Sequence, residues 1–279
     1  MRLSLSLALI AAPMAAGAAC ATDDEIAAYA ADYMAKRPTA ALSAGGTMED
    51  AACSAEKLAA ALEPEMGPVV GWKAGLTSAP AQEAFGVSEP VMGRLWGAAM
   101  LEDGAAVPEP HGARPLFEAD LILVVGDAAI NDATTPEEVM ASVREVRPFI
   151  ELPDLMLAEG EPLDGVTITA GGVGARGGVM GAGIAVDDPA AMAEALAAMT
   201  VRVTAADGAV LAEAPGAAVL GHPAHAVTWL TGKGVRFAEG DLISVGSFGP
   251  LLPPAQAGGA ATVRYEGLPG DPSVSVTFD

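Results

Sequence analysis

The sequence predicts an α+β fold, in which a mixed or antiparallel β core follows a layer of helices. Helical patterns open the chain at residues 22–37 and 47–62, and most later segments are short apolar or alternating runs typical of strands. Single helices and long loops interrupt these runs, whereas a doubly wound parallel sheet would need regular alternation of strand and helix. At 279 residues the chain is long enough to bury a substantial core.

Residues 1–19 have the pattern of a secretory signal. Arg2 supplies positive charge, residues 3–12 form an apolar run too short to cross a bilayer, and small residues follow at 13–19. We therefore expect an exported, periplasmic protein. Cleavage near residues 18–19 would leave Cys20 and Cys53, which we expect to form a disulfide in an oxidising compartment. Cleavage after Ala21 would instead remove Cys20 and leave Cys53 as a free thiol.

The formal net charge is -22, from 36 acidic and 14 basic residues. This balance disfavours nucleic acid or an anionic membrane as a partner. No transmembrane segment is visible in the sequence. An anionic substrate would need a local cation to enter so acidic a protein.

The two N-terminal helices have clear start signals. Thr22 or Asp23 is the expected cap of the first helix and Thr47 that of the second, and acidic residues fill the first turn of each. We expect residues 20–66 to form an N-terminal helical segment without chemistry of its own, and residues 67–279 to form the catalytic domain.

An apolar strand at residues 116–126 contains two carboxylates, Glu118 and Asp120. Residues two apart in a strand share one face, so the two side chains point the same way with Cα atoms roughly 6.5–7 Å apart. Two such charges converging to ~4 Å repel by about 4 kcal/mol at an effective dielectric constant of about 20. Either a metal, a lysine or an arginine lies between them, or the strand is at an edge with its acids in water.

Two other segments place charge among apolar residues. Residues 147–157 contain Glu151 and Asp154, and residues 68–77 contain Lys73 in an apolar, glycine-rich setting. A lysine there is either reaching to the surface or held inside for a purpose.

The middle of the chain reads as short elements. A turn-rich connection spans 86–96, Asp103–Gly104 indicates a hairpin at 100–107, and Thr135 with Pro136 starts a helix at 135–146. Residues 166–183 are glycine-rich with Arg176 as the only charge, and they match neither the dinucleotide nor the P-loop pattern.

The C-terminal third mixes helices and strands. His222 and His225 stand at the start of one helix, where they are either metal ligands or capping and surface contacts. We expect helices at 187–199 and 221–232, a hairpin at 200–213 around Asp207–Gly208, and strands at 242–248, 261–265 and 273–278.

Several segments together resemble the 2-keto-4-pentenoate hydratase branch of the fumarylacetoacetate hydrolase superfamily. The resemblance covers residues 69–278, and its most specific piece is GAAVLGHPAHAVTWL at 216–230. The other pieces, in order, are GWKAGLT at 71–77, MLEDGA at 100–105, the acids at 118 and 120, IELPD at 150–154 and GDLISVGSF at 240–248.

The resemblance implies a mixed β-sheet roll or sandwich core and a divalent metal, Mg²⁺ or Mn²⁺, held by Glu118, Asp120 and Glu151. It implies that Lys73 is catalytic, since burial in an apolar pocket can depress a lysine pKa enough for proton transfer. Ser247 would bind substrate. The implied reaction adds water to a small 2-hydroxydienoate and gives a 4-hydroxy-2-oxo acid, and family members often form homo-oligomers.

This chain also departs from the family pattern. Asp120 stands where a glutamate is usual, Gly249 replaces a threonine, and residues 173–176 read Val-Gly-Ala-Arg instead of Asn-Ala-Ser-Ser. Two alternatives therefore stay open. One is a decarboxylase of 2-oxo-3-enedioates with the same metal site, and the other is an exported, non-catalytic binder of 2-oxo acids in which Arg176 clamps the ligand carboxylate.

Overall fold

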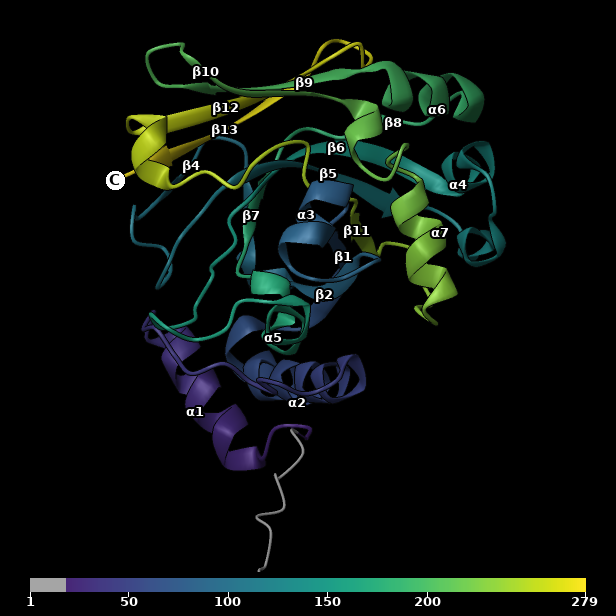
Figure 1. Cartoon of the computed structure of the whole chain (residues 1–279). Coiled ribbons are helices and arrows are strands. Elements are labelled where there is room, and N and C mark those ends of the chain that lie inside the picture. The colour runs from purple at the N-terminus through teal and green to yellow at the C-terminus, as the bar shows by residue number, and fades with distance from the viewer. Residues whose placement is uncertain (1–18) are drawn as a thin grey trace, which may run out of the picture.

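The computed structural model describes residues 19–279. The predicted signal segment, apart from Ala19, lies outside these residues. Two β-sheets pack together at one end of the molecule, and a layer of helices lies at the other end (Figure 1). The predicted α+β class with an N-terminal helical layer is confirmed.

The larger sheet has eight strands in the order β2-β1-β11-β5-β6-β7-β3, with β8 paired to β6. It is mixed, because β1–β11 and β3–β7 are parallel pairs and the other pairs are antiparallel. Every residue of β5 is buried, since this strand lies near the middle of the sheet. The strands are β1 (Val69–Gly75), β2 (Val91–Trp96), β3 (Met100–Glu102), β5 (Glu118–Val125), β6 (Val143–Glu151), β7 (Gly178–Met180), β8 (Ile184–Ala185) and β11 (Leu242–Ser244).

The smaller sheet has five strands in the order β10-β9-β12-β13-β4. Its strands are β4 (Ala105–Val107), β9 (Thr200–Ala205), β10 (Val210–Pro215), β12 (Ala260–Glu266) and β13 (Ser273–Phe278). The main core lies between the sheets: Leu121 and Leu123 of β5 belong to the same buried cluster as Val203 and Val263 of the smaller sheet. Because successive side chains of β5 point to opposite faces of the sheet, Glu118 and Asp120 lie on the face away from Leu121 and Leu123.

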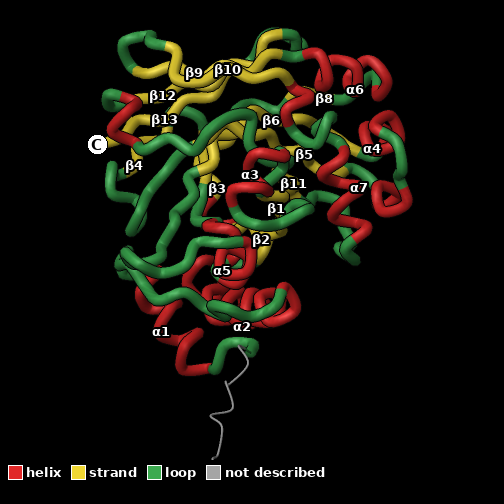
Figure 2. The backbone as a smooth tube through the Cα atoms, in the orientation of Figure 1, coloured by secondary structure: helices red, strands yellow, loops and turns green. Residues whose placement is uncertain are grey.

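The N-terminal layer consists of α1 (Asp23–Met34) and α2 (Met48–Met66), seen at the bottom of Figure 2. Each begins in a capping box, Thr22 with Glu25 and Thr47 with Asp50, as the threonine caps predicted. The predicted disulfide joins Cys20 to Cys53 of α2, with the two Cα atoms 5.5 Å apart. The layer shares its apolar core with the rest of the chain: Tyr29, Tyr33, Leu58 and Leu62 pack with Trp96 and Leu157.

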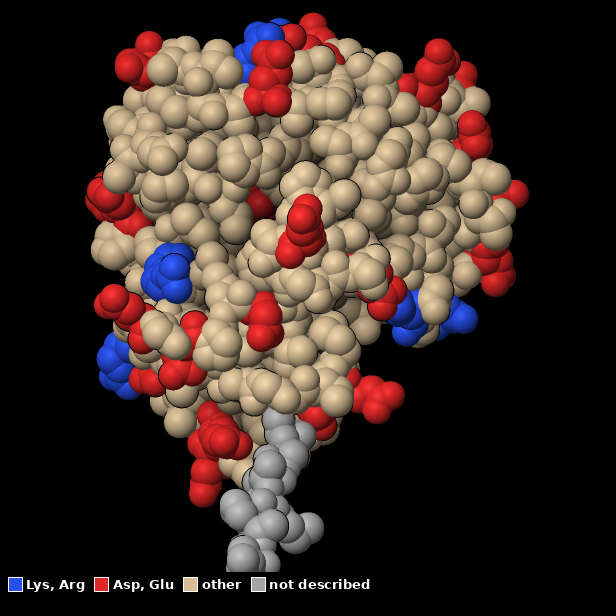
Figure 3. Space-filling model, in the orientation of Figure 1, with Lys and Arg blue, Asp and Glu red and all other residues tan. Residues whose placement is uncertain are grey.

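The described part of the chain has five other α-helices, which cover the sheets or connect their strands: α3 (Ala79–Ala84), α4 (Pro136–Ala141), α5 (Gly165–Ala170), α6 (Pro189–Ala198) and α7 (His225–Gly232). Within residues 19–279, no helix combines the length and the apolar composition needed to span a membrane. Acidic side chains are spread over the face drawn in Figure 3, where they outnumber the basic ones, in keeping with the net charge of -22.

The structure corrects three local predictions. Asp103–Gly104 joins β3 to β4, but these strands belong to different sheets, so the predicted hairpin is wrong. The helix predicted at 135–146 ends at Ala141, because the chain from Val143 onward forms β6 and pairs with β5. The connection predicted at 86–96 contains β2. The glycine-rich stretch, for which the sequence predicted no secondary structure, overlaps α5, whose Asp164 cap outweighs the poor helix propensity of its Val, Thr and Ile residues.

Candidate active site

The register of the larger sheet brings four ionisable side chains to one face. Glu118 of β5 lies directly opposite Glu151 of β6, and Asp120 shares the face of Glu118. Lys73 of β1 pairs with Ser244 of β11, which is the neighbour of β5. Four strands from distant parts of the sequence thus build one polar cluster in an otherwise apolar sheet.

Lys73 and Glu151 form a buried ion pair, with side-chain exposures of 3% and 2%. The Lys73 ammonium group donates to Glu151 Oε1 and to the backbone carbonyl of Val173, the latter at 3.2 Å. Burial alone would lower the pKa of Lys73, but the carboxylates of Glu151 and Glu118 outweigh it and the pKa is raised. The depressed pKa expected from the sequence is therefore wrong in direction, and Lys73 is a cation held against the acids.

Asp120 is fully buried and is satisfied by the protein itself. Its carboxylate accepts hydrogen bonds from the Ser244 hydroxyl and from the amides of Leu121 at 2.5 Å and Gly246 at 3.0 Å. Burial, with the nearby Glu151 carboxylate, raises the pKa of Asp120 to about 7 in spite of these donors. Asp120 therefore ties β5 to the segment after β11.

Glu118 reaches the edge of a cavity and is 8% exposed. Burial and the neighbouring Glu151 raise its pKa well above the ordinary value. Glu118 is the member of the cluster that a molecule in the cavity would meet first, together with Lys73.

We tested the cluster for its fit to a divalent cation. Glu151 Oε2 is buried and accepts no hydrogen bond from any residue between 19 and 279, so one carboxylate oxygen is left for a further positive partner. Carboxylate oxygens are also the ligands that Mg²⁺ and Mn²⁺ prefer. The described residues do not, however, hold three or more His, Cys, Asp or Glu side chains already gathered as a metal site. The fit thus rests on Glu118 and on the free Oε2 of Glu151, because Lys73 engages Oε1 of Glu151 and Ser244 engages Asp120.

The cavity beside the cluster has a volume of about 200 Å³. Lys73, Glu118 and Ser247 lie along its polar part, and Lys73 is the one cationic residue among the lining residues that the structure describes. The remainder is mostly apolar and comes from α3, α5 and the loops around them, including Ala81, Phe85, Leu155, Ile168, Val173 and Leu251. The cavity can therefore receive a molecule with one anionic end and an apolar body.

The other residues singled out in the sequence have different surroundings. Ser247 lines the cavity and its hydroxyl donates to the Gly249 carbonyl at 2.8 Å. Arg176 is not a cavity residue; its guanidinium contacts Asp154 and the carbonyl of Tyr33 instead. Arg176 is therefore not placed to clamp a ligand in this cavity.

His222 and His225 make structural contacts. His222 accepts from the amide of Ala224 at 3.0 Å and donates to the carbonyl of Ala193 at 2.9 Å, so its ring is neutral. His225 contacts the Leu220 carbonyl at 2.9 Å. Of the two readings of these histidines, the structure favours local contacts at the helix start over metal ligation.

Sequence reasoning missed three supports of the site. Ser244 is a polar residue within the apolar run 242–245, which is a usable signal. Tyr265 of β12 donates its hydroxyl to the backbone of Asp120 and Phe149, and the Val173 carbonyl receives Lys73. Nothing local in the sequence marks these last two, since each acts across more than 99 positions of the chain.

Known proteins resemble the chain in both fold and sequence. The chain superposes with a TM-score of 0.76 on 4-oxalocrotonate decarboxylase from Pseudomonas putida G7 complexed with magnesium and adipate, at 24% identity over 94% of this chain and 100% of that one. This likeness shows that the chain shares the α+β fold of that decarboxylase. No protein-family model matches the chain.

Two curated relatives are hydratases. The chain is 32% identical over 206 residues to 2-hydroxyhexa-2,4-dienoate hydratase from Comamonas testosteroni, covering 72% of this chain and 75% of that one. It is 29% identical over 214 residues to 2-keto-4-pentenoate hydratase from Burkholderia vietnamiensis, covering 75% and 78%. The chain belongs to the 2-keto-4-pentenoate hydratase branch of the superfamily, and it is an enzyme of the hydratase-like lyase class.

Proposed function

We propose that the protein is a divalent-metal-dependent hydratase that adds water to a small 2-hydroxydienoate and yields a 4-hydroxy-2-oxo acid. The observation that carries this proposal is the buried cluster of Lys73, Glu118, Asp120 and Glu151 at the polar end of an otherwise apolar cavity. The names of the hydratase relatives support the same reaction class.

We propose that Glu118, Asp120 and Glu151 hold the cation, Mg²⁺ or Mn²⁺. The free Oε2 of Glu151 supports this assignment, and Oδ2 of Asp120 keeps a second lone pair beyond its hydrogen bond from the Ser244 hydroxyl. The solved decarboxylase of this fold binds magnesium. A bound cation would supply Lewis acidity to the oxygens at the carboxylate end of the substrate.

The chain's own groups bind the substrate and handle protons. The Lys73 ammonium group, cationic and at the edge of the cavity, attracts the substrate carboxylate and holds a proton at Nζ. Ser247, beside it, offers a hydroxyl to substrate or water. The walls from α3 and α5 exclude bulk water from the apolar part of the dienoate.

The cavity favours the hydratase over a dicarboxylate decarboxylase. A second carboxylate at the apolar end would lose its hydration, which is costly. Among residues 19–279, Lys73 is the only Lys or Arg that lines the cavity, and it lies at the polar end. A methyl or vinyl terminus would instead gain from apolar burial. We therefore propose a monocarboxylate substrate.

Turnover tests the reaction directly. The purified protein is mixed with freshly generated 2-hydroxypenta-2,4-dienoate or 2-hydroxyhexa-2,4-dienoate, with Mg²⁺, Mn²⁺ or EDTA, and loss of the dienol absorbance is followed. We expect metal-dependent loss and no CO₂ release from a 2-hydroxy dienedioate. CO₂ release would favour the decarboxylase, and a ligand-induced thermal shift without any turnover would favour a non-catalytic binder.

Calorimetry tests the metal site. We expect Mg²⁺ or Mn²⁺ to bind the wild type and to bind Glu118→Gln at least about tenfold more weakly, since one charged ligand is lost. Glu109→Gln is the matched control, because Glu109 is an exposed acid outside the cluster. Equal affinities in wild type and Glu118→Gln would reject the assignment.

We further propose that the protein is exported to the periplasm and forms homo-oligomers. The disulfide between Cys20 and Cys53 supports an oxidising compartment, and the signal pattern of residues 1–19 supports export. Fractionation of cells producing the full chain tests the location, and light scattering of the purified protein tests the assembly.

A further inference from the structure

The carbonyl that receives Lys73 belongs to a backbone segment in an uncommon conformation. Val173 has φ 59° and ψ 34°, between Gly172 at φ 72° and Gly174 at φ 62°. The left-handed region is easy for glycine but rare for a β-branched residue. Residues 172–174 therefore need outside contacts to hold them, and such strain gathers at functional sites.

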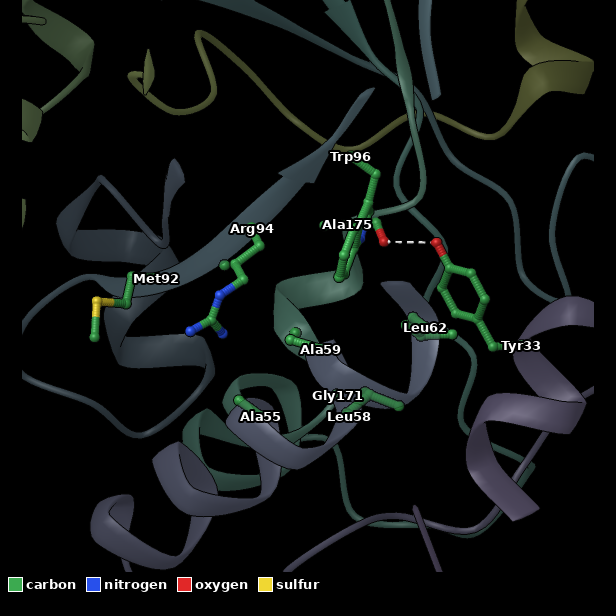
Figure 4. Close-up of a pocket in the computed structure, with 12 residues that line it drawn as sticks. Tyr33, Ala55, Leu58, Ala59, Leu62, Met92, Arg94, Trp96, Gly171 and Ala175 are labelled. Carbon is green, nitrogen blue, oxygen red and sulfur yellow. Dashed lines mark hydrogen bonds between the residues drawn. The ribbon is translucent and has the colours of Figure 1, made fainter. Parts of the chain in front are cut away.

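Two hydrogen bonds hold the segment from opposite sides. The amide of Asp154 donates to the Gly174 carbonyl at 2.9 Å. The hydroxyl of Tyr33, on α1, donates to the Ala175 carbonyl at 3.0 Å, and Figure 4 shows the Tyr33 side chain reaching across to that residue. The N-terminal helical layer thus contacts the segment that holds Lys73.

Arg176 adds further contacts that hold the same segment, residues 172–176. Its Nε donates to Asp154 Oδ2 at 2.9 Å, an Nη atom donates to the Tyr33 carbonyl at 2.7 Å, and the guanidinium lies 4.0 Å from the centre of the Tyr33 ring. The Asp154 side chain is completely buried and also accepts from the amides of Ala113 and Arg114, at 2.9 and 2.7 Å. Arg176 therefore fastens Asp154 and α1 to the end of the 172–176 segment.

We propose that Arg176 and Tyr33 are positioning residues for Lys73. By fixing residues 172–176, they keep the Val173 carbonyl where it holds the Lys73 ammonium group beside Glu151. The N-terminal layer, tied down by the Cys20–Cys53 disulfide, is then part of the active-site support. The kinetic consequence rests on the proposed function, whereas the structural consequence does not.

Lysine labelling tests the structural part without any turnover. The chain has four lysines, Lys36, Lys57, Lys73 and Lys233, and acetylation of each by a water-soluble acetyl ester is followed by mass spectrometry. We expect Lys73 to be nearly unlabelled in the wild type. In Tyr33→Phe and Arg176→Met, its labelling relative to Lys36 and Lys57 should rise at least about fivefold, because the ammonium group loses its fixed acceptor.

The control is Tyr29→Phe. Tyr29 lies on the same helix, is 4% exposed against 3% for Tyr33, and makes no hydrogen bond to residues 172–176. The lysine labelling pattern of Tyr29→Phe should match that of the wild type. Tyr33→Phe loses only a hydroxyl and carries the test by itself should Arg176→Met not fold. Unchanged Lys73 labelling in Tyr33→Phe, or an equal rise in Tyr29→Phe, overturns the proposal.

Kinetics separates positioning from direct contact. We expect Arg176→Met to lower kcat about 10- to 100-fold, the size expected for a misplaced catalytic group, with KM changed less than about threefold. The Tyr33→Phe/Arg176→Met pair should lose little more than Arg176→Met alone, since both act on one segment. A raised KM at unchanged kcat would mean that Arg176 touches substrate and would overturn the proposal. A wild type without any turnover would count against the proposed function. The lysine labelling would then still show whether Tyr33 and Arg176 position Lys73.

Discussion

The Lys73 ammonium group lies directly against the Glu151 carboxylate, although their strands, β1 and β6, are separated in the sheet by β11 and β5. The acids of the site therefore have an internal counter-ion in the folded chain itself. A cation that enters the cluster must share these carboxylates with Lys73, which makes the ion pair the natural target for mutation.

Replacing Lys73 by Met should lower the metal-free unfolding free energy by about 3–5 kcal/mol, because it leaves a buried carboxylate unpaired. Added Mg²⁺ or Mn²⁺ should recover part of the loss by taking over the positive charge. Urea unfolding with and without metal measures both effects. Lys57→Met, which breaks an exposed pair with Asp23, is the control and should cost under about 1 kcal/mol. Equal stability of Lys73→Met and wild type would contradict the argument.

Replacing Leu155 by Arg should change which acids the cavity accepts. Leu155 lines the apolar part of the cavity, where a new guanidinium could pair with a second carboxylate. We expect the ratio of the hexanoate to the adipate inhibition constant to rise at least about tenfold over the wild type, the scale on which pairing a buried polar group discriminates ligands. Leu155→Met controls for the loss of leucine. No change in the ratio would show that this wall does not select the substrate's far end.

Removing the disulfide should destabilise the N-terminal layer. Cys20 and Cys53 are 33 residues apart, and closing a loop of that length is worth about 3–4 kcal/mol in the chain-entropy estimate. The Cys20→Ser/Cys53→Ser double variant should lose about this much, and dithiothreitol should destabilise the wild type but not the variant. Thermal unfolding in both conditions provides the measurement. A melting temperature of the wild type that ignores the reductant would refute the expectation.

His222 should make the protein sensitive to mild acid. Burial lowers the pKa of His222, and its neutral ring donates to Ala193 and accepts from Ala224. The unfolded chain, with a histidine pKa of about 6.5, then binds the proton more readily than the folded one. The contribution of His222 to the free energy of unfolding is complete above about pH 6.5. It is lost as the pH falls towards the lower pKa that His222 has in the folded chain.

The test compares wild type with His222→Asn by urea unfolding between pH 7 and pH 5. His225 and Glu137, which face the ring, are present in both proteins. The variant should lose less stability over this range, by at most about 1.4 kcal/mol per pH unit, the limit for one proton. Parallel pH profiles would show that the His222 proton is not linked to folding.

Part of the site and several elements of the fold were predictable because their sequence signals are local. Strand alternation put Glu118 and Asp120 on one face, threonine caps marked α1 and α2, and Asp207–Gly208 marked the β9–β10 hairpin. Each of these patterns spans only a few residues, so it does not depend on the tertiary contacts of the rest of the chain.

The tertiary structure decided how the charges are paired and which sheet each strand joins. Lys73 meets Glu151 across 78 positions of sequence, and this proximity keeps its pKa high where composition suggested a low one. Arg176 is held by Tyr33 across 143 positions and so faces α1, away from the cavity. The two strands around Asp103–Gly104 separate because β7 and β13 offer longer-range partners. Periodicity and caps are properties of neighbouring residues, but desolvation, charge pairing and strand partnership depend on what the folded chain brings alongside.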